Sequence, residues 1–304
     1  MPGSTDLKVA PPICIAATGD KCGEGILWDS ATQSLYWTDV NRFLVHRYRM
    51  EGGELKTWFF LEPVTCVLAT NRSGTLALVL GSGVVLWEPA SDLRHEHLFF
   101  MPGWPAVRCN DAGVDPRGDL WLGSMRNNVR ENGESCEIGG RDGALYRVDG
   151  GGGWRELRRD LGIANTLLWT SDCTRFYLGD SLRNEIWAYD YEITEGSIRN
   201  ERSFFRDYPR GLPDGSALDS EGYIWNCRYG GGCIVRISPL GQVDRAIEMP
   251  VGNPTNCAFG GEDGSTLFVT CASPAPGQWE RLGGCLFAIE TNVTGAPSYA
   301  FKCV

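Results

Sequence analysis

Six copies of one turn-and-strand pattern fill this chain, and they constrain its fold more than any other feature. Each copy has a turn containing Gly or Asp, followed by a strand, as in VDPRGDLWLGS (Val114–Ser124) and LDSEGYIWNCRY (Leu218–Tyr229). A second strand-like run follows each copy, for example GALYRVDG (Gly143–Gly150). Corresponding positions are 41, 44, 56, 48 and 43 residues apart when measured at Tyr36, Ala77, Trp121, Tyr177, Trp225 and Phe268. A hairpin repeat of about 40–50 residues is typical of propeller blades.

The repeat therefore predicts an all-β protein, a six-bladed β-propeller that residues 1–304 form as one domain. No segment shows a long apolar period of 3.6 residues, which argues against helices. A ring of blades leaves one axial tunnel, which we expect to be polar and to hold the functional site. A ring also has to close. We expect the run Ile13–Ala17 to pair with the last blade near Phe301–Val304, because this pairing would cover exposed sheet edges.

Charge and composition exclude several classes of function. The net charge of −10 argues against nucleic acid and anionic membranes as partners. Apolar runs of about five residues are too short to span a membrane. The first residues, MPGSTDLKVAPP, lack the basic and then apolar regions of a signal peptide, so we expect a cytoplasmic protein. The twelve Cys are spread over most blades without a CxxC pair, which favours reduced thiols over disulfides. We also expect a monomer.

Histidine is too scarce for several kinds of catalytic site. The three His are His46, His95 and His97, and all lie on predicted outer strands. A His-based zinc site, a Ser-His-Asp triad and a Cys-His dyad therefore lack their ligands or their base. His95 and His97 share one face of a strand, where they could hold a metal, but a solvated strand face is the default interpretation.

Polar residues recur at one place in the repeat, the connection or first strand before each copy. These residues are Glu24, Asn110, Asn165, Asp214 and Asn256. Equivalent positions on different blades converge on the axis of a ring, so two carboxylates and up to three amide oxygens would meet there. Such oxygen donors suit Ca²⁺, Mg²⁺ or Mn²⁺. Each residue alone has a structural explanation, for example as part of a turn, and only their shared position predicts a metal site.

Two further features lie near these residues. Arg108 and Asn110 share a face of an extended strand, and beside a metal they could bind a polyhydroxylated or anionic substrate. Alternatively, Arg108 pairs with Asp111 or Asp115. The longest repeat step contains the polar segment 126–142, which we interpret as a lid over one mouth of the tunnel. The alternative is a flexible connection.

Several of these segments resemble the senescence marker protein / gluconolactonase / luciferin-regenerating enzyme family. The similar segments are GEGILWD, the RxND of Arg108–Asp111 with VDPRGDLWLGSM, IANTLLWTSD, and LPDGSALDSEGYIWNCRYGGG with NPTNCAFGG. The resemblance covers nearly the whole chain, with order and spacing kept. It implies a six-bladed propeller with one divalent metal on its axis. The implied metal ligands are Glu24, Asn165 and Asp214, and the implied substrate contacts are Arg108 and Asn110.

One substrate contact differs from the pattern of that family. Some members carry a carboxylate soon after the Gly-Ser/Thr-Met of the third blade, whereas here Gly123-Ser124-Met125 is followed by Arg126-Asn127-Asn128. We therefore expect Asn128 to make an altered contact with the substrate. Different members use different ions, so the resemblance leaves Ca²⁺, Mn²⁺, Mg²⁺, Zn²⁺ and Fe(II) open.

The resemblance implies hydrolysis of a sugar lactone, and we predict a metal-dependent lactonase acting on a glucono-, xylono- or arabinonolactone. The metal would act as a Lewis acid on the lactone carbonyl, and Asp214 would be the general base. Three alternatives stay open: a non-enzymatic calcium-binding propeller, a hydrolase of another ester or lactone, and a protein-binding propeller. The third arises because Tyr36–Asp39 spells the YWTD motif of receptor propellers, which occurs only once here.

Overall fold

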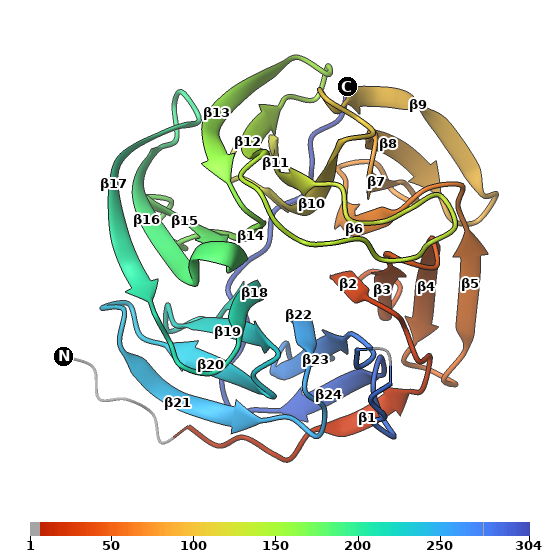
Figure 1. Cartoon of the computed structure of the whole chain (residues 1–304), viewed down its shortest axis with the longest axis vertical. Coiled ribbons are helices and arrows are strands. Elements are labelled where there is room, and N and C mark those ends of the chain that lie inside the picture. Colours follow the sequence, from red (N-terminus) through yellow and green to blue (C-terminus); the bar gives the residue numbers. More distant parts are fainter. Residues whose placement is uncertain (1–6, 276) are drawn as a thin grey trace.

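The computed structural model describes residues 7–275 and 277–304 and consists of six antiparallel sheets of four strands around one axis (Figure 1). The predicted all-β, six-bladed propeller is confirmed. The first six residues of the segment considered above for a signal peptide lie outside the described residues. Within the described residues, no helix has the length and apolar character needed to cross a membrane.

Every blade uses its strands in the same order from the axis outward. The innermost strands are β2 (Gly23–Asp29), β6 (Val64–Ala69), β10 (Val107–Val114), β14 (Ala164–Trp169), β18 (Leu212–Leu218) and β22 (Pro254–Gly260). The second strands are β3 (Ser34–Asp39), β7 (Leu76–Leu80), β11 (Leu120–Arg126), β15 (Arg175–Asp180), β19 (Ile224–Tyr229) and β23 (Thr266–Cys271). These second strands contain the six markers of the sequence repeat.

The outer half of each blade consists of a third strand and a more exposed outermost strand. The third strands are β4 (Leu44–Arg49), β8 (Gly83–Glu88), β12 (Gly143–Val148), β16 (Glu185–Glu192), β20 (Cys233–Ile237) and β24 (Leu286–Glu290). The outermost strands are β5 (Leu55–Phe59), β9 (Leu93–Phe100), β13 (Trp154–Leu161), β17 (Ser197–Arg206), β21 (Val243–Glu248) and β1 (Ile13–Ala16). A short 3₁₀ helix, η1 (Ser181–Arg183), follows β15.

A buried aspartate explains why the turn recurs in the sequence. In the third blade, Asp115 accepts hydrogen bonds from the backbone N–H groups of Arg117 and Asp119, each 2.9 Å long, and from the Trp121 indole at 2.9 Å. Asp219 makes the same three contacts in the fifth blade, ending at Trp225. Each aspartate thus fixes a turn and satisfies the polar atom of a fully buried tryptophan.

The core lies between neighbouring blades, where apolar side chains of adjacent sheets pack face to face. One cluster joins the third and fourth blades around Trp121, whose ring lies 5.3 Å from that of Trp169 in an edge-on contact. All twelve cysteines are free thiols, and most of them are buried within these clusters. The blades therefore supply the stability, and the axial positions are left for function.

The two ends of the chain close the ring in different ways. Strand β1 pairs with β24, with Ile13 opposite Ala288, so the prediction that the N-terminal run joins the last blade is confirmed. The predicted partner Phe301–Val304 is wrong. That segment instead crosses the far face of the ring, where the N–H of Phe301 bonds to the carbonyl of Ala69 at 2.9 Å. Phe301 fills a buried site between the second and third blades, and the sheet edge is already covered by β1.

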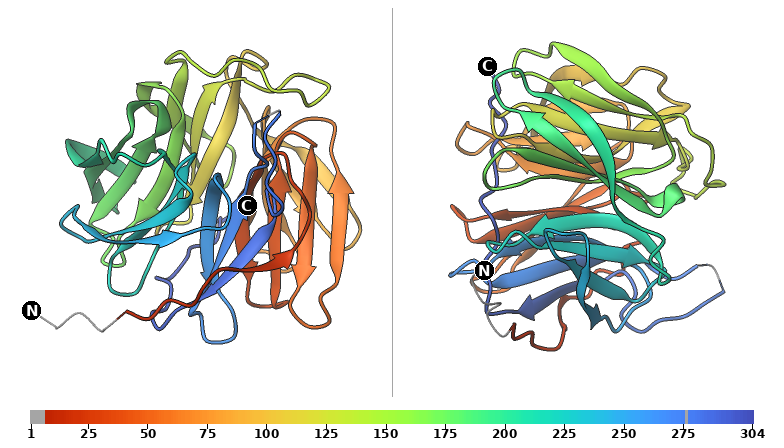
Figure 2. Two further views of the ribbon diagram at one scale, coloured as in Figure 1. Left: turned by 60° about the horizontal axis from the view of Figure 1, so that its bottom comes forward. Right: turned by 90° about the vertical axis from the view of Figure 1, so that its left-hand side faces the viewer.

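The segment 126–142 projects from the third blade on the face where the innermost strands begin (Figure 2). It reaches the first blade, because the Asn41 amide donates to the Gly133 carbonyl at 3.0 Å. Val129 is buried in the core cluster of the first two blades. This segment therefore has fixed attachments over the ring, although its role as a lid stays a prediction.

Candidate functional site

The five polar residues predicted to meet at the axis all lie on innermost strands. Glu24, Asn110, Asn165, Asp214 and Asn256 belong to β2, β10, β14, β18 and β22. Each lies in the first half of its strand, at the face covered by the segment 126–142. The second blade is the exception, since its innermost strand carries the uncharged pair Thr65-Cys66 at this level.

A register shift accompanies the polar position on every innermost strand. In β2 the shift falls between Glu24 and Leu27, and in β14 between Asn165 and Leu168. The other four innermost strands have equivalent irregularities. A bulge turns side chains away from the regular alternation of a strand. The repeated bulges therefore aim several consecutive groups of one strand at the axis.

Three carboxylates share this site, and each has a raised pKa. Burial and the nearby Asp111 raise the pKa of Glu24 to about 7. Burial, Glu24 and Asp111 raise the pKa of Asp214 well above its usual range. Burial raises the pKa of Asp111 itself to about 6. These shifts show that negative charge is concentrated here at the expense of desolvation and mutual repulsion.

Asn256 holds two of the carboxylate-bearing strands in contact. Its Nδ2 donates to Oε2 of Glu24 at 3.1 Å. Its side chain also packs against Gly215, where an added Cβ would lie 2.2–2.6 Å from the amide atoms. Glycine is needed at this position because no larger residue leaves room for the amide. Asn256 thereby fixes Glu24 beside Asp214.

A chain of hydrogen bonds orients the amide of Asn165. Its Nδ2 donates to Oγ of Ser181 at 2.8 Å, and that hydroxyl donates to the carbonyl of Pro213 at 2.6 Å. The Oδ1 of Asn165 accepts from Nδ2 of Asn110 at 3.1 Å. The donor side of Asn165 is therefore occupied by protein, and its oxygen is turned toward the site.

Arg108 does not form the ion pair that was one alternative from the sequence. Its Nη1 donates to Oδ1 of Asn110 and to the carbonyl of Cys109, both at 2.8 Å. Its Nε and Nη2 donate to Oδ1 of Asn128, at 3.1 and 2.8 Å. Asp115, one of the proposed partners, is occupied by Trp121 and by Tyr191. Arg108 is buried, and it joins the predicted substrate residues Asn110 and Asn128 into one cluster.

Sequence reasoning missed several groups at the site. Asp111 was considered only as a partner for Arg108, but it lies among the carboxylates, with the Cys66 thiol 3.7 Å from its Oδ1. The thiol of Cys22 is also near, because Glu24, Asp214 and Asp39 all raise its pKa. The spacing of Cys22 and Glu24, two residues apart at the start of β2, was the available signal.

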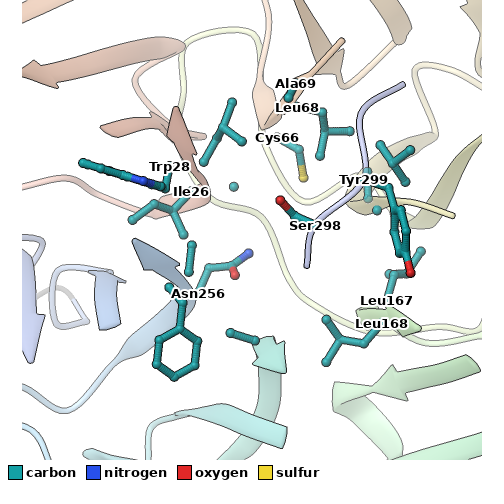
Figure 3. A pocket seen from close by; sticks show the side chains of 18 of the residues that line it. Ile26, Trp28, Cys66, Leu68, Ala69, Leu167, Leu168, Asn256, Ser298 and Tyr299 are labelled. Carbon is teal, nitrogen blue, oxygen red and sulfur yellow. The ribbon is translucent and has the colours of Figure 1, made fainter. Parts of the chain in front are cut away.

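The site continues along the axis into a cavity whose lining is partly polar and partly apolar. This cavity lies beyond the carboxylates and has a volume of about 360 Å³. Asp111 and Asn256 line both the cavity and the site. Figure 3 shows the apolar side chains of its wall, among them Ile26, Leu68 and Leu167. The apolar part of the wall comes from the later residues of the innermost strands. Ser298 and Tyr299, from the C-terminal segment, contribute to its lining.

The histidines lie away from the axis. His95 contacts Glu88 at 3.2 Å and His97 contacts Ser82 at 2.8 Å, both on the outer part of the second blade. His46 is buried beside Thr57 and Asp20 in the first blade. In the described part of the chain no group of three or more His, Cys, Asp or Glu side chains is arranged to hold a metal. An ion at the axis would need amide oxygens in addition to Glu24 and Asp214.

The axial residues fit such an ion by their chemistry. Glu24 and Asp214 are two carboxylates that no lysine or arginine pairs with in the described residues, and Asn165 adds a neutral oxygen. A divalent cation would relieve the repulsion that raises both pKa values.

The chain is similar to proteins of one known family over most of its length. Residues 22–273 match the family model described as SMP-30/gluconolactonase/LRE-like region. The chain is 30% identical to the 6-deoxy-6-sulfogluconolactonase of Pseudomonas putida, with 95% of this chain and 97% of that protein covered. It is 29% identical to regucalcin of Gallus gallus, with 95% and 97% covered. It is 30% identical to a pentonolactonase of Haloferax volcanii, with 94% and 96% covered.

Solved structures show the same fold. A calcium-binding regucalcin from Agrobacterium tumefaciens superposes with a TM-score of 0.88 at 23% identity, covering 96% of this chain and 97% of that one. A luciferin-regenerating enzyme superposes with a TM-score of 0.83 at 26% identity, covering 96% and 98%.

Proposed function

The chain belongs to the SMP-30/gluconolactonase/LRE-like family, and on that premise we propose that it hydrolyses a sugar lactone at the axial site with the help of one divalent metal ion. The predicted family is confirmed by the matching family model. The predicted enzyme class, a sugar lactonase, is confirmed by curated relatives that are lactonases over nearly the whole chain. The particular sugar and the ion are proposals.

The single observation that carries the metal proposal is the unpaired carboxylate pair. Glu24 and Asp214 have raised pKa values, and hydrogen bonds from Asn256 and the Gly25 backbone only partly offset this for Glu24. We assign Glu24, Asn165 and Asp214 as the ligands. When bound there, a divalent ion would polarise the lactone carbonyl and lower the pKa of a water toward neutrality.

The residues of the chain then have separate roles. Asp214 takes the proton from the attacking water, because no histidine lies at the axis. The carbonyl carbon gains the hydroxyl, the ring C–O bond breaks, and the proton passes to the departing ring oxygen, which becomes a hydroxyl of the aldonic acid. Arg108 donates a hydrogen bond to the substrate, and Asn110, whose amide N–H groups bond to Ala164 and Asn165, orients Arg108 through its Oδ1. Asn128 supplies a contact from the segment 126–142 and helps exclude water.

A second candidate is a calcium-binding propeller without an enzymatic role, favoured by the regucalcin relatives and by the solved regucalcin that is described as calcium-binding. The two functions separate in one experiment. Purified protein is stripped with chelator, loaded in turn with Ca²⁺, Mn²⁺, Mg²⁺, Zn²⁺ or Fe(II), and assayed against glucono-, xylono- and arabinonolactones. Turnover above the spontaneous rate with at least one ion supports the lactonase. Tight calcium binding without turnover of any lactone supports the alternative.

A further inference from the structure

Three arginines of the described chain are buried, and they differ in how their charge is balanced. Arg236 contacts three carboxylates, Asp219 at 2.6 Å, Glu221 at 2.7 Å and Asp244 at 3.1 Å. Its guanidinium is therefore neutralised within its own blade.

Arg228 is enclosed by the backbone. It donates to the carbonyls of Arg210 and Gly211, at 3.0 and 2.7 Å, and to the side-chain oxygen of Asn184 at 2.5 Å. Its ring contact with Tyr208 completes this enclosure. Arg228 therefore has a structural role, because its hydrogen bonds hold the loop before β18 in place.

Arg108 shares with Arg228 a set of neutral acceptors, but its acceptors include the predicted substrate residues of the axial site. Its four hydrogen bonds go to two amide oxygens and one backbone carbonyl, all neutral, and Nη2 carries a second N–H for which the described residues supply no acceptor. No carboxylate lies within ion-pair distance in residues 7–275 and 277–304. Glu24 is the carboxylate whose charge acts on the pKa of Arg108, and it is assigned to the metal. A buried positive charge without a counter-ion is unfavourable unless a ligand supplies one.

Resting on the proposed lactonase function, we propose that the preferred substrate is a sugar lactone bearing an additional anionic group, a carboxylate, sulfonate or phosphate, and that Arg108 is its counter-ion. Asn128 is a specificity-determining residue in this arrangement. As an amide it orients the guanidinium through Nε and Nη2 without neutralising it. A carboxylate at position 128 would form an internal two-point ion pair with Arg108 and remove the site for the anion.

The wild-type protein provides the first test. In the metal-loaded state, kcat/KM is measured for gluconolactone and for lactones of the same ring that carry a carboxylate, a sulfonate or a phosphate on the terminal carbon. The expected preference for at least one charged lactone is about ten- to a hundredfold, the ratio for one charge-assisted hydrogen bond. The three charged lactones distinguish the kind of anion. Equal or better turnover of the neutral lactone overturns the inference and leaves the lactonase function intact. If the metal-loaded protein turns over none of the lactones, the lactonase function itself is wrong.

The second test uses Asn128→Asp, with Asn132→Asp as the matched control. Asn132 lies on the same segment and is exposed, and its Oδ1, which accepts from the Glu134 backbone, is retained by Asp. Asn128→Asp should lower kcat/KM for both lactones, because Asn128 lines the substrate site, but the loss for the charged lactone should be about ten- to a hundredfold greater than that for the neutral lactone. Asn132→Asp should change neither. Equal loss on both lactones would show a merely structural role for Asn128 and refute the assignment.

Binding gives a readout independent of turnover. Calorimetry on the metal-loaded protein compares gluconate with a ring-opened product that carries a second anionic group. We expect the dianion to bind about tenfold or more tightly to the wild type, and this difference to disappear in Asn128→Asp. Equal affinity of the two products for the wild type contradicts the inference, as does a preference for the dianion that survives in Asn128→Asp.

Discussion

Replacing Glu24 with glutamine should stabilise the metal-free protein and abolish its stabilisation by metal. Glutamine keeps the oxygen that accepts from the Gly25 N–H and from Asn256. It removes the negative charge that burial and Asp111 oppose. The same substitution therefore has opposite effects in the two states, and a general packing defect cannot produce that pattern.

The magnitude follows from the pKa. A rise from 4.5 to about 7 on folding corresponds to roughly 3 kcal/mol at ~1.36 kcal/mol per pKa unit. Because the pKa of Glu24 is raised in the folded state, the contribution of its protonated carboxyl to the free energy of unfolding is fully present below pH 4.5. That contribution is lost as the pH rises through about 7. For 304 residues the unfolding entropy is about 0.6 kcal/mol/K, so the substitution should raise Tm by about 5 °C at pH 8 and change it little at pH 4.5.

The assay is thermal unfolding in chelator and in excess divalent ion at both pH values. A saturating ion at 100 times its Kd adds about 2.7 kcal/mol to the wild type, and the Glu24→Gln variant should gain little. Glu96→Gln, on the exposed strand β9, is the control and should follow the wild type throughout. A lower Tm for metal-free Glu24→Gln at pH 8, or an undiminished response to metal, would refute both the electrostatic argument and the ligand assignment.

Four further outcomes are expected. Asp214→Asn should retain the circular dichroism spectrum of the wild type but lose about 10²–10⁴-fold in turnover at saturating metal, and near-normal turnover would exclude it as the base. Metal affinity, measured by calorimetry, should increase from pH 5 to pH 7, because Glu24 and Asp111 lose protons over that range; an affinity independent of pH would contradict this. Gly215→Ala should lower stability by about 1–3 kcal/mol in denaturant titrations, since its Cβ would overlap Asn256. Phe301→Ala should cost about 3–5 kcal/mol in the same titration, and a loss below 1 kcal/mol would show that the C-terminal segment does not anchor the core.

Much of the architecture was predictable because each blade is encoded locally. In the third and fifth blades the turn aspartate and the tryptophan that it binds lie within about ten residues of each other. The sequence repeat therefore locates the second strand of each blade. Closure by β1 was also predictable, because an unpaired sheet edge requires a partner. The destination of Phe301–Val304 was not predictable, because its contacts with Ala69 and Gly118 are far away in sequence and no local pattern specifies them.

At the site, the sequence predicted which strands contribute but not every group that reaches the axis. Asn110 and Asp111 are adjacent, and regular alternation would send them to opposite faces. The bulge between Cys109 and Ala112 interrupts that alternation, so both belong to the axial cluster. The hydrogen bond between Arg108 and Asn128 could not be predicted from the sequence. Asn128 lies on the segment 126–142, and the path of this segment depends on a distant contact between Asn41 and Gly133.

The pairing of β1 with β24 also has a consequence for synthesis on the ribosome. Ile13 is synthesised well over two hundred residues before its partner Ala288. Closing a loop of that length costs about 5 kcal/mol of chain entropy, and this cost is met only when the sixth blade is complete. Until then the nascent chain carries β1 without a sheet to join, and afterwards β24 presents an open edge until β1 arrives. The ring therefore becomes a cooperative unit only after β24 has been synthesised, and this pairing step is where aggregation of the newly made chain is most favoured.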